Sequence, residues 1–176
     1  MIETTQDVTI AAALGAVWDH VSDIGGWAPL MPGMQSVEMI DENNSRWVLK
    51  VGVGGLVRIV TVAVRVDRWA GPGEVDFTYD VTSDPVKGSG TYRASPQPDG
   101  ATQVLLHVKV EGSGPMAPMW EAMGRPVLPQ LAKAFAGSLK QQIEAQAGNA
   151  PPAAPATQLG IIARLLAWLR SRLGAN

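Results

Sequence analysis

Residues 74–82, EVDFTYDVT, alternate polar and apolar side chains at every position. Successive side chains of an extended chain point to opposite faces. The alternation therefore predicts a β-strand with one covered face and one solvent-facing face. The residues expected on the covered face are Val75, Phe77, Tyr79 and Val81.

The same period of two recurs in neighbouring stretches, which are SRWVLKVGV at 45–53, RIVTVAVRVDRW at 58–69 and QVLLHVKVEG at 103–112. Turn-forming runs separate these stretches at hairpin spacing, namely DENN at 41–44, AGPG at 70–73 and QPDG at 97–100. We therefore expect an antiparallel meander within a sheet of about seven strands. Its covered face is expected to include Trp47, Leu49, Val51, Val53, Val60, Val62, Val64, Val66, Val104, Leu106, Val108 and Val110.

Two helical regions flank the strands. Residues 11–23 place apolar side chains at amphipathic spacing, at Leu14, Val17, Trp18 and Val21. Residues 115–146 predict a long helix whose apolar stripe is Leu128, Leu131, Phe135, Leu139 and Ile143. We expect the sheet to grip this helix around Ala132 to Leu139.

The beginning of the long helix is less regular than the rest. Gly124, Pro126 and Pro129 are expected to interrupt or kink it. An internal proline removes a backbone donor and clashes with the preceding turn.

Composition and charge restrict the classes of function. The chain has 176 residues, no cysteine and a net charge of −2. It therefore lacks a disulfide framework or a cysteine zinc site, which fits a reducing cytosol. The start, MIETTQDVTI, does not resemble a secretory signal, so we expect a cytoplasmic protein. Residues 1–148 carry 11 basic and 16 acidic side chains, a balance that argues against nucleic-acid binding.

The C-terminal part differs from the body. We expect a domain at 1–147, an Ala/Pro-rich linker at 148–158 and a cationic amphipathic helix at 159–174. Its fifteen residues from Leu159 to Leu173 would reach about 22 Å as a helix, short of the ~30 Å bilayer core, so we expect it to lie at the inner face of the cell membrane. The predicted membrane-binding residues are Leu159, Ile161, Ile162, Arg164, Leu165, Leu166, Trp168, Leu169, Arg170, Arg172 and Leu173. The same apolar face could instead dock on a partner or on the domain itself.

The sequence offers little for catalysis. Its two histidines, His20 and His107, lie where a surface or helix-end residue is the simpler interpretation. It contains no HExxH, GxSxG, P-loop or paired-carboxylate motif. We therefore expect neither catalytic residues, nor a metal site, nor a covalent cofactor, and a protein that is not an enzyme.

Apolar residues are the better candidates for function. Two segments rich in methionine and tryptophan, 27–34 and 116–127, flank the predicted sheet, and methionine adapts to ligands of varied shape. Gly88 and Gly90 share one strand face with Val86 and Tyr92, so they either leave room for a ligand or permit close packing. The predicted ligand-binding residues are Trp27, Leu30, Met31, Met34, Phe77, Tyr79, Gly88, Gly90, Leu106, Met116, Met119, Trp120, Met123 and Leu131. Trp27, Met31, Met34, Met116, Trp120 and Met123 are expected at the mouth of a cavity.

The order of elements resembles the α+β helix-grip fold of START-like (SRPBCC) proteins, in which an antiparallel sheet wraps around a long C-terminal helix and encloses an apolar cavity. DIGGWAPLMPGM at 23–34, LKVGVGGL at 49–56, VKGSGTY at 86–92 and FAGSLKQQIE at 135–144 resemble the CoxG family, whose members are associated with carbon monoxide dehydrogenase. Met34 departs from the cysteine that many relatives carry after Pro-Gly, so a role needing a thiol is not expected here.

This resemblance implies association with a molybdenum CO dehydrogenase, whose electrons must reach a membrane quinone. Combined with the cavity and the tail, it suggests a non-enzymatic carrier that shuttles menaquinone or ubiquinone between membrane and enzyme. Two alternatives are an adaptor that recruits the dehydrogenase to the membrane without transporting a ligand, and a START-like polyketide cyclase or aromatase.

Overall fold

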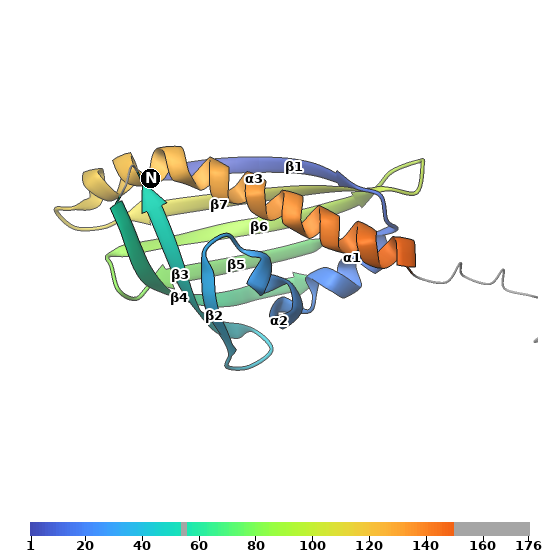
Figure 1. Ribbon diagram of the computed structural model, residues 1–176, viewed down its shortest axis with the longest axis horizontal. Helices are drawn as coiled ribbons and strands as arrows, with labels where there is room; N and C mark the ends of the chain where they lie inside the picture. Colours follow the sequence, from blue (N-terminus) through green and yellow to red (C-terminus); the bar gives the residue numbers. More distant parts are fainter. Residues whose placement is uncertain (54–55, 150–176) are drawn as a thin grey trace, which may run out of the picture.

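The computed structural model describes residues 1–53 and 56–149 and has one sheet and one long helix (Figure 1). In chain order the elements are β1 (Ile2–Ile10), α1 (Leu14–Val21), α2 (Ile24–Trp27), the 3-10 helix η1 (Ala28–Leu30), β2 (Met34–Met39), β3 (Asn44–Val53), β4 (Leu56–Ala70), β5 (Glu74–Val81), β6 (Val86–Pro96), β7 (Thr102–Gly112) and α3 (Ala117–Asn149).

The strands form one antiparallel sheet of seven, in the order β1-β7-β6-β5-β4-β3-β2. Strands β2 to β7 are a meander, and β1 closes the order by pairing with β7. The predicted sheet is therefore confirmed, together with its turns at 41–44, 70–73 and 97–100.

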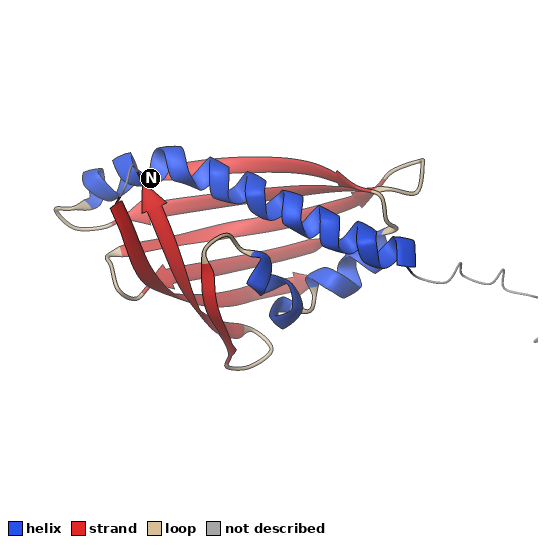
Figure 2. Ribbon diagram, viewed as in Figure 1, coloured by secondary structure: helices blue, strands red, loops and turns tan. Residues whose placement is uncertain are grey.

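Helix α3 crosses the concave face of the sheet (Figure 2). Its buried side chains recur every three or four residues, which turns one stripe of the helix toward the sheet. That stripe comprises Ala132, Phe135, Ala136, Leu139 and Ile143. The helix thus lies against the sheet where the sequence predicted it.

The expected interruption of α3 was wrong, because the helix runs without a break through Gly124, Pro126 and Pro129. The two prolines leave the carbonyls of Ala122 and Arg125 without their usual partners four residues on. Both prolines and both of these carbonyl-bearing residues are exposed. Water can therefore satisfy the freed carbonyls, and the helix continues.

Short helices α1, α2 and η1 cover one end of the sheet. Of the predicted amphipathic residues Val17 and Val21 are buried there, and Leu14 and Trp18 are half-buried. Ile24 of α2 is also buried. The carboxylate of Asp23 accepts the backbone N–H of Gly26 at 3.1 Å and so caps α2. Trp18 packs edge-on against Trp69 of β4 at 6.0 Å, which ties α1 to the sheet.

The predicted linker and membrane helix, residues 148–158 and 159–174, fall almost entirely outside the described residues. Among the described helices, none is long and apolar enough to cross a membrane.

Candidate ligand-binding cavity

A cavity of about 360 Å³ lies between the concave face of the sheet and α3. This volume is within the range of small-molecule pockets. Its wall on α3 extends from Trp120 to Leu139, about 28 Å at 1.5 Å per residue. The cavity is therefore elongated and follows the helix.

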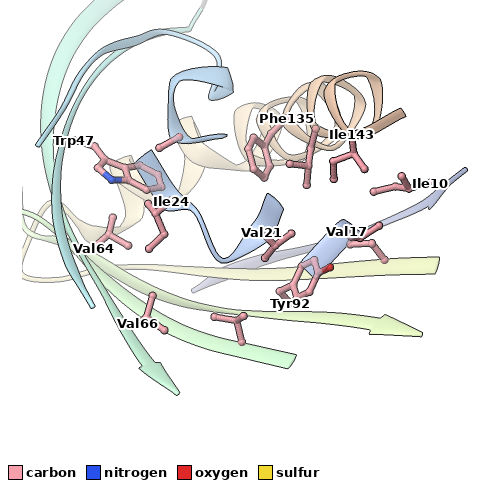
Figure 3. Close-up of a cluster of buried hydrophobic side chains, with 14 of the residues drawn as sticks. Ile10, Val17, Val21, Ile24, Trp47, Val64, Val66, Tyr92, Phe135 and Ile143 are labelled. Atoms are coloured by element: carbon pink, nitrogen blue, oxygen red, sulfur yellow. The ribbon is translucent and has the colours of Figure 1, made fainter. Parts of the chain in front are cut away.

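The wall is almost entirely apolar. The inward-facing residues of the strands supply most of it. Helices α1 and α2 contribute a few side chains that converge with those of α3 (Figure 3), and Met31 follows η1. Besides the predicted residues, it includes Val21, Ile24, Trp47, Leu49, Val51, Val60, Val62, Val64, Val66, Trp69, Val75, Val81, Val86, Tyr92, Val108, Val110, Val127, Leu128 and Phe135.

Burial along α3 shows which end of the cavity is open. Trp120, Met123 and Val127, near the start of the helix, are only half-buried, whereas Phe135 and Leu139 are buried. The strands show the same gradient. On β5 Val81 is half-buried and Val75 is buried, and on β6 Val86 is half-buried and Tyr92 is buried. The mouth of the cavity therefore lies beside the first turns of α3, and its closed end lies under α1.

Eight of the fourteen predicted ligand-binding residues line this cavity, namely Trp27, Met31, Phe77, Tyr79, Leu106, Trp120, Met123 and Leu131. Four others do not line it. Leu30 and Met34 pack against the core from η1 and the edge strand β2. Met116 precedes α3, and Met119 lies about 100° around the helix from Trp120; their exposed fractions are 49% and 39%.

Gly88 and Gly90 need a correction. Both lie on the cavity face, but they leave no room for a ligand. A Cβ at Gly90 would collide with Cζ of Phe77, and one at Gly88 would collide with the Tyr79 hydroxyl. The two aromatic rings therefore occupy the space above the glycines, and close packing is the correct interpretation.

Trp27 and Met31 line the wall and are half-buried, as Trp120 and Met123 are, but the neighbours of Trp27 lie near the closed end. The Trp27 ring packs against Trp47 at 5.9 Å and against Phe135 at 5.4 Å, and both of these partners are buried. Its indole N–H donates to the carbonyl of Val21 at 2.8 Å, which fixes the ring. Trp27 therefore belongs to the closed half of the cavity, whereas Trp120 and Met123 lie near its mouth.

Three polar side chains lie among the lining residues, those of Tyr79, Tyr92 and Asp84. The Tyr79 hydroxyl donates to the carbonyl of Lys109 at 2.7 Å. The Tyr92 hydroxyl is buried without a hydrogen-bond partner in the described part of the chain. Burial raises the pKa of both tyrosines, so both stay protonated.

Asp84 is the charged member of the wall, and sequence reasoning missed it. Its side chain is 7% exposed and forms an ion pair with Arg58 of β4 at 2.9 Å. The Arg58 guanidinium also lies 4.9 Å from the ring centroid of Trp120. The sequence did indicate a charged group on the covered face of the sheet, because Arg58 alternates in phase with the covered residues Val60 and Val62.

The histidines lie outside the cavity wall. His107 contacts Thr5 at 2.9 Å and Glu3 at 3.6 Å on the opposite face of the sheet. His20 is on α1, with a buried Nε2 that has no partner among the described residues. Residues 1–53 and 56–149 contain no cluster of His, Asp and Glu suited to a metal ion.

Several solved structures share this fold. A conserved protein from Geobacillus kaustophilus is 18% identical with a TM-score of 0.71, covering 82% of this chain and 97% of that one. The Zhui aromatase/cyclase from Streptomyces sp. R1128 is 21% identical with a TM-score of 0.60, covering 83% and 95%. A START superfamily protein from Mycobacterium smegmatis is 18% identical with a TM-score of 0.61, covering 80% and 98%.

No curated protein matches the sequence. The family model described as polyketide cyclase/dehydrase and lipid transport matches residues 1–144. This family description names both enzymes and lipid-transport proteins. Membership therefore leaves open whether the cavity carries a ligand or transforms one. With most of its length matched, the chain belongs to the polyketide cyclase/dehydrase and lipid transport family.

Proposed function

We propose that the protein binds one lipophilic small molecule in the cavity under α3 and carries it without transforming it. The observation that supports this is the wall, which is long and apolar and includes one carboxylate, Asp84, already paired with Arg58. Apolar burial at about 25 cal/mol per Å² over several hundred Å² supplies on the order of 10 kcal/mol before ordering costs. Such a wall suits a hydrocarbon chain.

The ligand that we propose is a quinone with an isoprenoid side chain, either menaquinone or ubiquinone. An extended cavity of about 28 Å along α3 suits a chain better than a compact ring system. A quinone also needs few polar contacts, because its carbonyls only accept hydrogen bonds. The resemblance to CoxG proteins adds the proposed partner, a molybdenum CO dehydrogenase.

The membrane is the proposed second partner. A carrier of an insoluble quinone must reach the bilayer to load or unload, and the cationic amphipathic segment 159–174 supplies a reversible attachment. Function in the cytoplasm, with attachment to the inner face of the membrane, follows from this proposal.

A polyketide cyclase is the main alternative, since the family and the Zhui neighbour include that activity. A cyclase needs a general acid or base aimed at its substrate. In the described wall the Tyr79 hydroxyl is engaged by a backbone carbonyl and Asp84 by Arg58. The Tyr92 hydroxyl has no partner among the described residues, but burial raises its pKa and keeps it protonated, so the described wall holds no free general base, which favours the carrier.

Lipid extraction and mass spectrometry of the purified protein test the proposal. Wild type should release a quinone, and Met123→Glu should not, because a charged carboxylate in the apolar wall is unfavourable beside a hydrocarbon chain. Met119→Glu is the matched control, one helical turn earlier and 39% exposed, and it should load like wild type. Wild-type protein that releases no quinone would favour the adaptor, and release of a polyketide would favour the cyclase.

A further inference from the structure

Three side chains from separate elements meet at the mouth of the cavity. Arg58 comes from β4, Asp84 from the β5–β6 turn and Trp120 from the first turns of α3. The guanidinium pairs with the carboxylate at 2.9 Å and lies 4.9 Å from the centroid of the indole. In Figure 1 the start of β4 reaches the first turns of α3, as this contact requires.

The guanidinium retains hydrogen-bond donors for a ligand. Arg58 carries five N–H donors, and its ion pair with Asp84 runs through one nitrogen, Nη2. Its side chain is 41% exposed, so it borders both the solvent and the cavity wall. A ligand that emerges beside Trp120 would meet this group.

At the closed end the described residues offer one unpaired donor, the neutral Tyr92 hydroxyl, and no charged donor. The Tyr92 hydroxyl points under α1 toward Val17 (Figure 3), and solvent cannot reach its oxygen. The Tyr79 hydroxyl is used by Lys109, and the indole N–H groups of Trp27 and Trp47 are used by Val21 and Ser45. A carbonyl placed at the closed end would exchange its hydrogen bonds to water for at most one, from a neutral hydroxyl turned toward Val17. The polar end of a ligand is therefore favoured at the mouth, where the charged Arg58 donors are partly exposed.

On the basis of the proposed function, we propose that the carried molecule lies with its polar head at the mouth, where a carbonyl oxygen accepts a hydrogen bond from Arg58 beside Trp120, and with its chain running inward along α3. Asp84 makes this a site for a neutral head. Because its carboxylate balances the guanidinium at 2.9 Å, the pair has no net charge to attract an anionic head such as that of a fatty acid.

Tryptophan fluorescence with decylubiquinone as the probe tests the orientation, because a quinone ring quenches an indole that it contacts. Trp120→Phe should remove most of the quenching that wild type shows on binding. Trp27→Phe, which alters the closed half, should leave it nearly unchanged. The reverse result, with quenching lost in Trp27→Phe and kept in Trp120→Phe, would place the head at the closed end and overturn the proposal.

Two charge variants test the role of the ion pair. Arg58→Met with Asp84→Asn removes the donors and the charge together, and it should weaken decylubiquinone binding about ten- to hundredfold, the effect of losing one hydrogen bond to a charged group. Asp84→Asn alone leaves Arg58 unbalanced and should increase the affinity for palmitate at least several-fold. If the double variant binds decylubiquinone as tightly as wild type, the head does not contact Arg58. That result leaves the carrier function intact, whereas wild-type protein that binds no decylubiquinone would remove both proposals.

Discussion

Phe77 lies directly opposite Gly90 in the β5–β6 ladder, and its ring occupies the space where a side chain at Gly90 would begin. Tyr79 stands in the same relation to Gly88 two residues along. The two glycines thus let large rings lie flat against the sheet, which keeps those rings out of the centre of the cavity.

Alanine substitutions of these glycines should separate cavity size from stability. In Gly90→Ala the new methyl would meet the free end of the Phe77 ring, which can swing into the cavity. We expect a folded protein with about 1–2 kcal/mol less stability and a reduced capacity for ligand. Denaturant unfolding and quinone extraction measure the two effects.

Gly88→Ala is the contrasting case. Its Cβ would collide with the carbonyl oxygen of Lys109, a backbone atom of the adjacent strand that cannot move aside cheaply. We expect a larger loss of stability than in Gly90→Ala. Equal losses in the two variants would show that the Phe77 ring is as fixed as the backbone.

The two cavity tyrosines should respond differently to loss of the hydroxyl. Tyr79→Phe leaves the Lys109 carbonyl without its donor and should cost about 1 kcal/mol. Tyr92→Phe removes a buried hydroxyl without a partner in the described part of the chain, so it should be neutral or stabilising. Urea unfolding of both variants checks this. A clear destabilisation by Tyr92→Phe would mean that an ordered water or another group satisfies that hydroxyl.

Period-two alternation was sufficient to predict the sheet and its covered face, because burial of one face is a property of each strand by itself. Which covered residues border empty space is a different question, since it depends on the side chains across the cavity. Gly90 illustrates this, because its role follows from a ring on the neighbouring strand. Asp84 and Arg58 illustrate it too, because they are far apart in the sequence and meet only after β4 and β5 have paired.

The prediction of the long helix was wrong only at its start, where an interruption was expected from the prolines without considering that the helix is exposed to water there. Pro126 and Pro129 carry the ordinary helix-breaking penalty, but their exposed side of α3 lets water take the place of the lost backbone bonds. Periodicity of the apolar stripe outweighed that penalty.

Glu144 should make stability depend on pH. Its carboxylate accepts the backbone N–H of Ala11 at 2.7 Å and pairs with Lys140 at 2.9 Å. These bonds hold the pKa of Glu144 below its ordinary value of 4.5, with the Ala11 hydrogen bond as the larger cause. The folded state therefore binds this proton less readily than the unfolded state. The stabilisation is fully present above the ordinary pKa and is lost as the pH falls through the lower folded pKa.

Glu144→Gln should therefore be less stable than wild type at pH 7, by about 1 kcal/mol or less because the pair is partly exposed. The difference should shrink below the ordinary pKa of the carboxyl group. Thermal unfolding of both proteins at about pH 7 and about pH 3, on either side of that pKa, measures it. A difference that stays constant across this range would exclude ionisation of Glu144 as its cause.

Removal of the residues after Gly148 should leave a folded domain that no longer binds anionic vesicles. The seven strands found in the described part of the chain lie before this point, and so do the buried side chains described for α3, so we expect the domain to fold without the tail. The apolar face of 159–174 and its three arginines should supply the membrane affinity, at about 1 kcal/mol per arginine on anionic lipid. Co-sedimentation with vesicles of anionic and of neutral lipid measures the loss.

Full-length protein with Arg164, Arg170 and Arg172 each changed to Glu is the matched control, because it keeps the apolar face. It should lose its preference for anionic vesicles, and a truncated domain that still pellets with them would move the membrane site to the body of the protein.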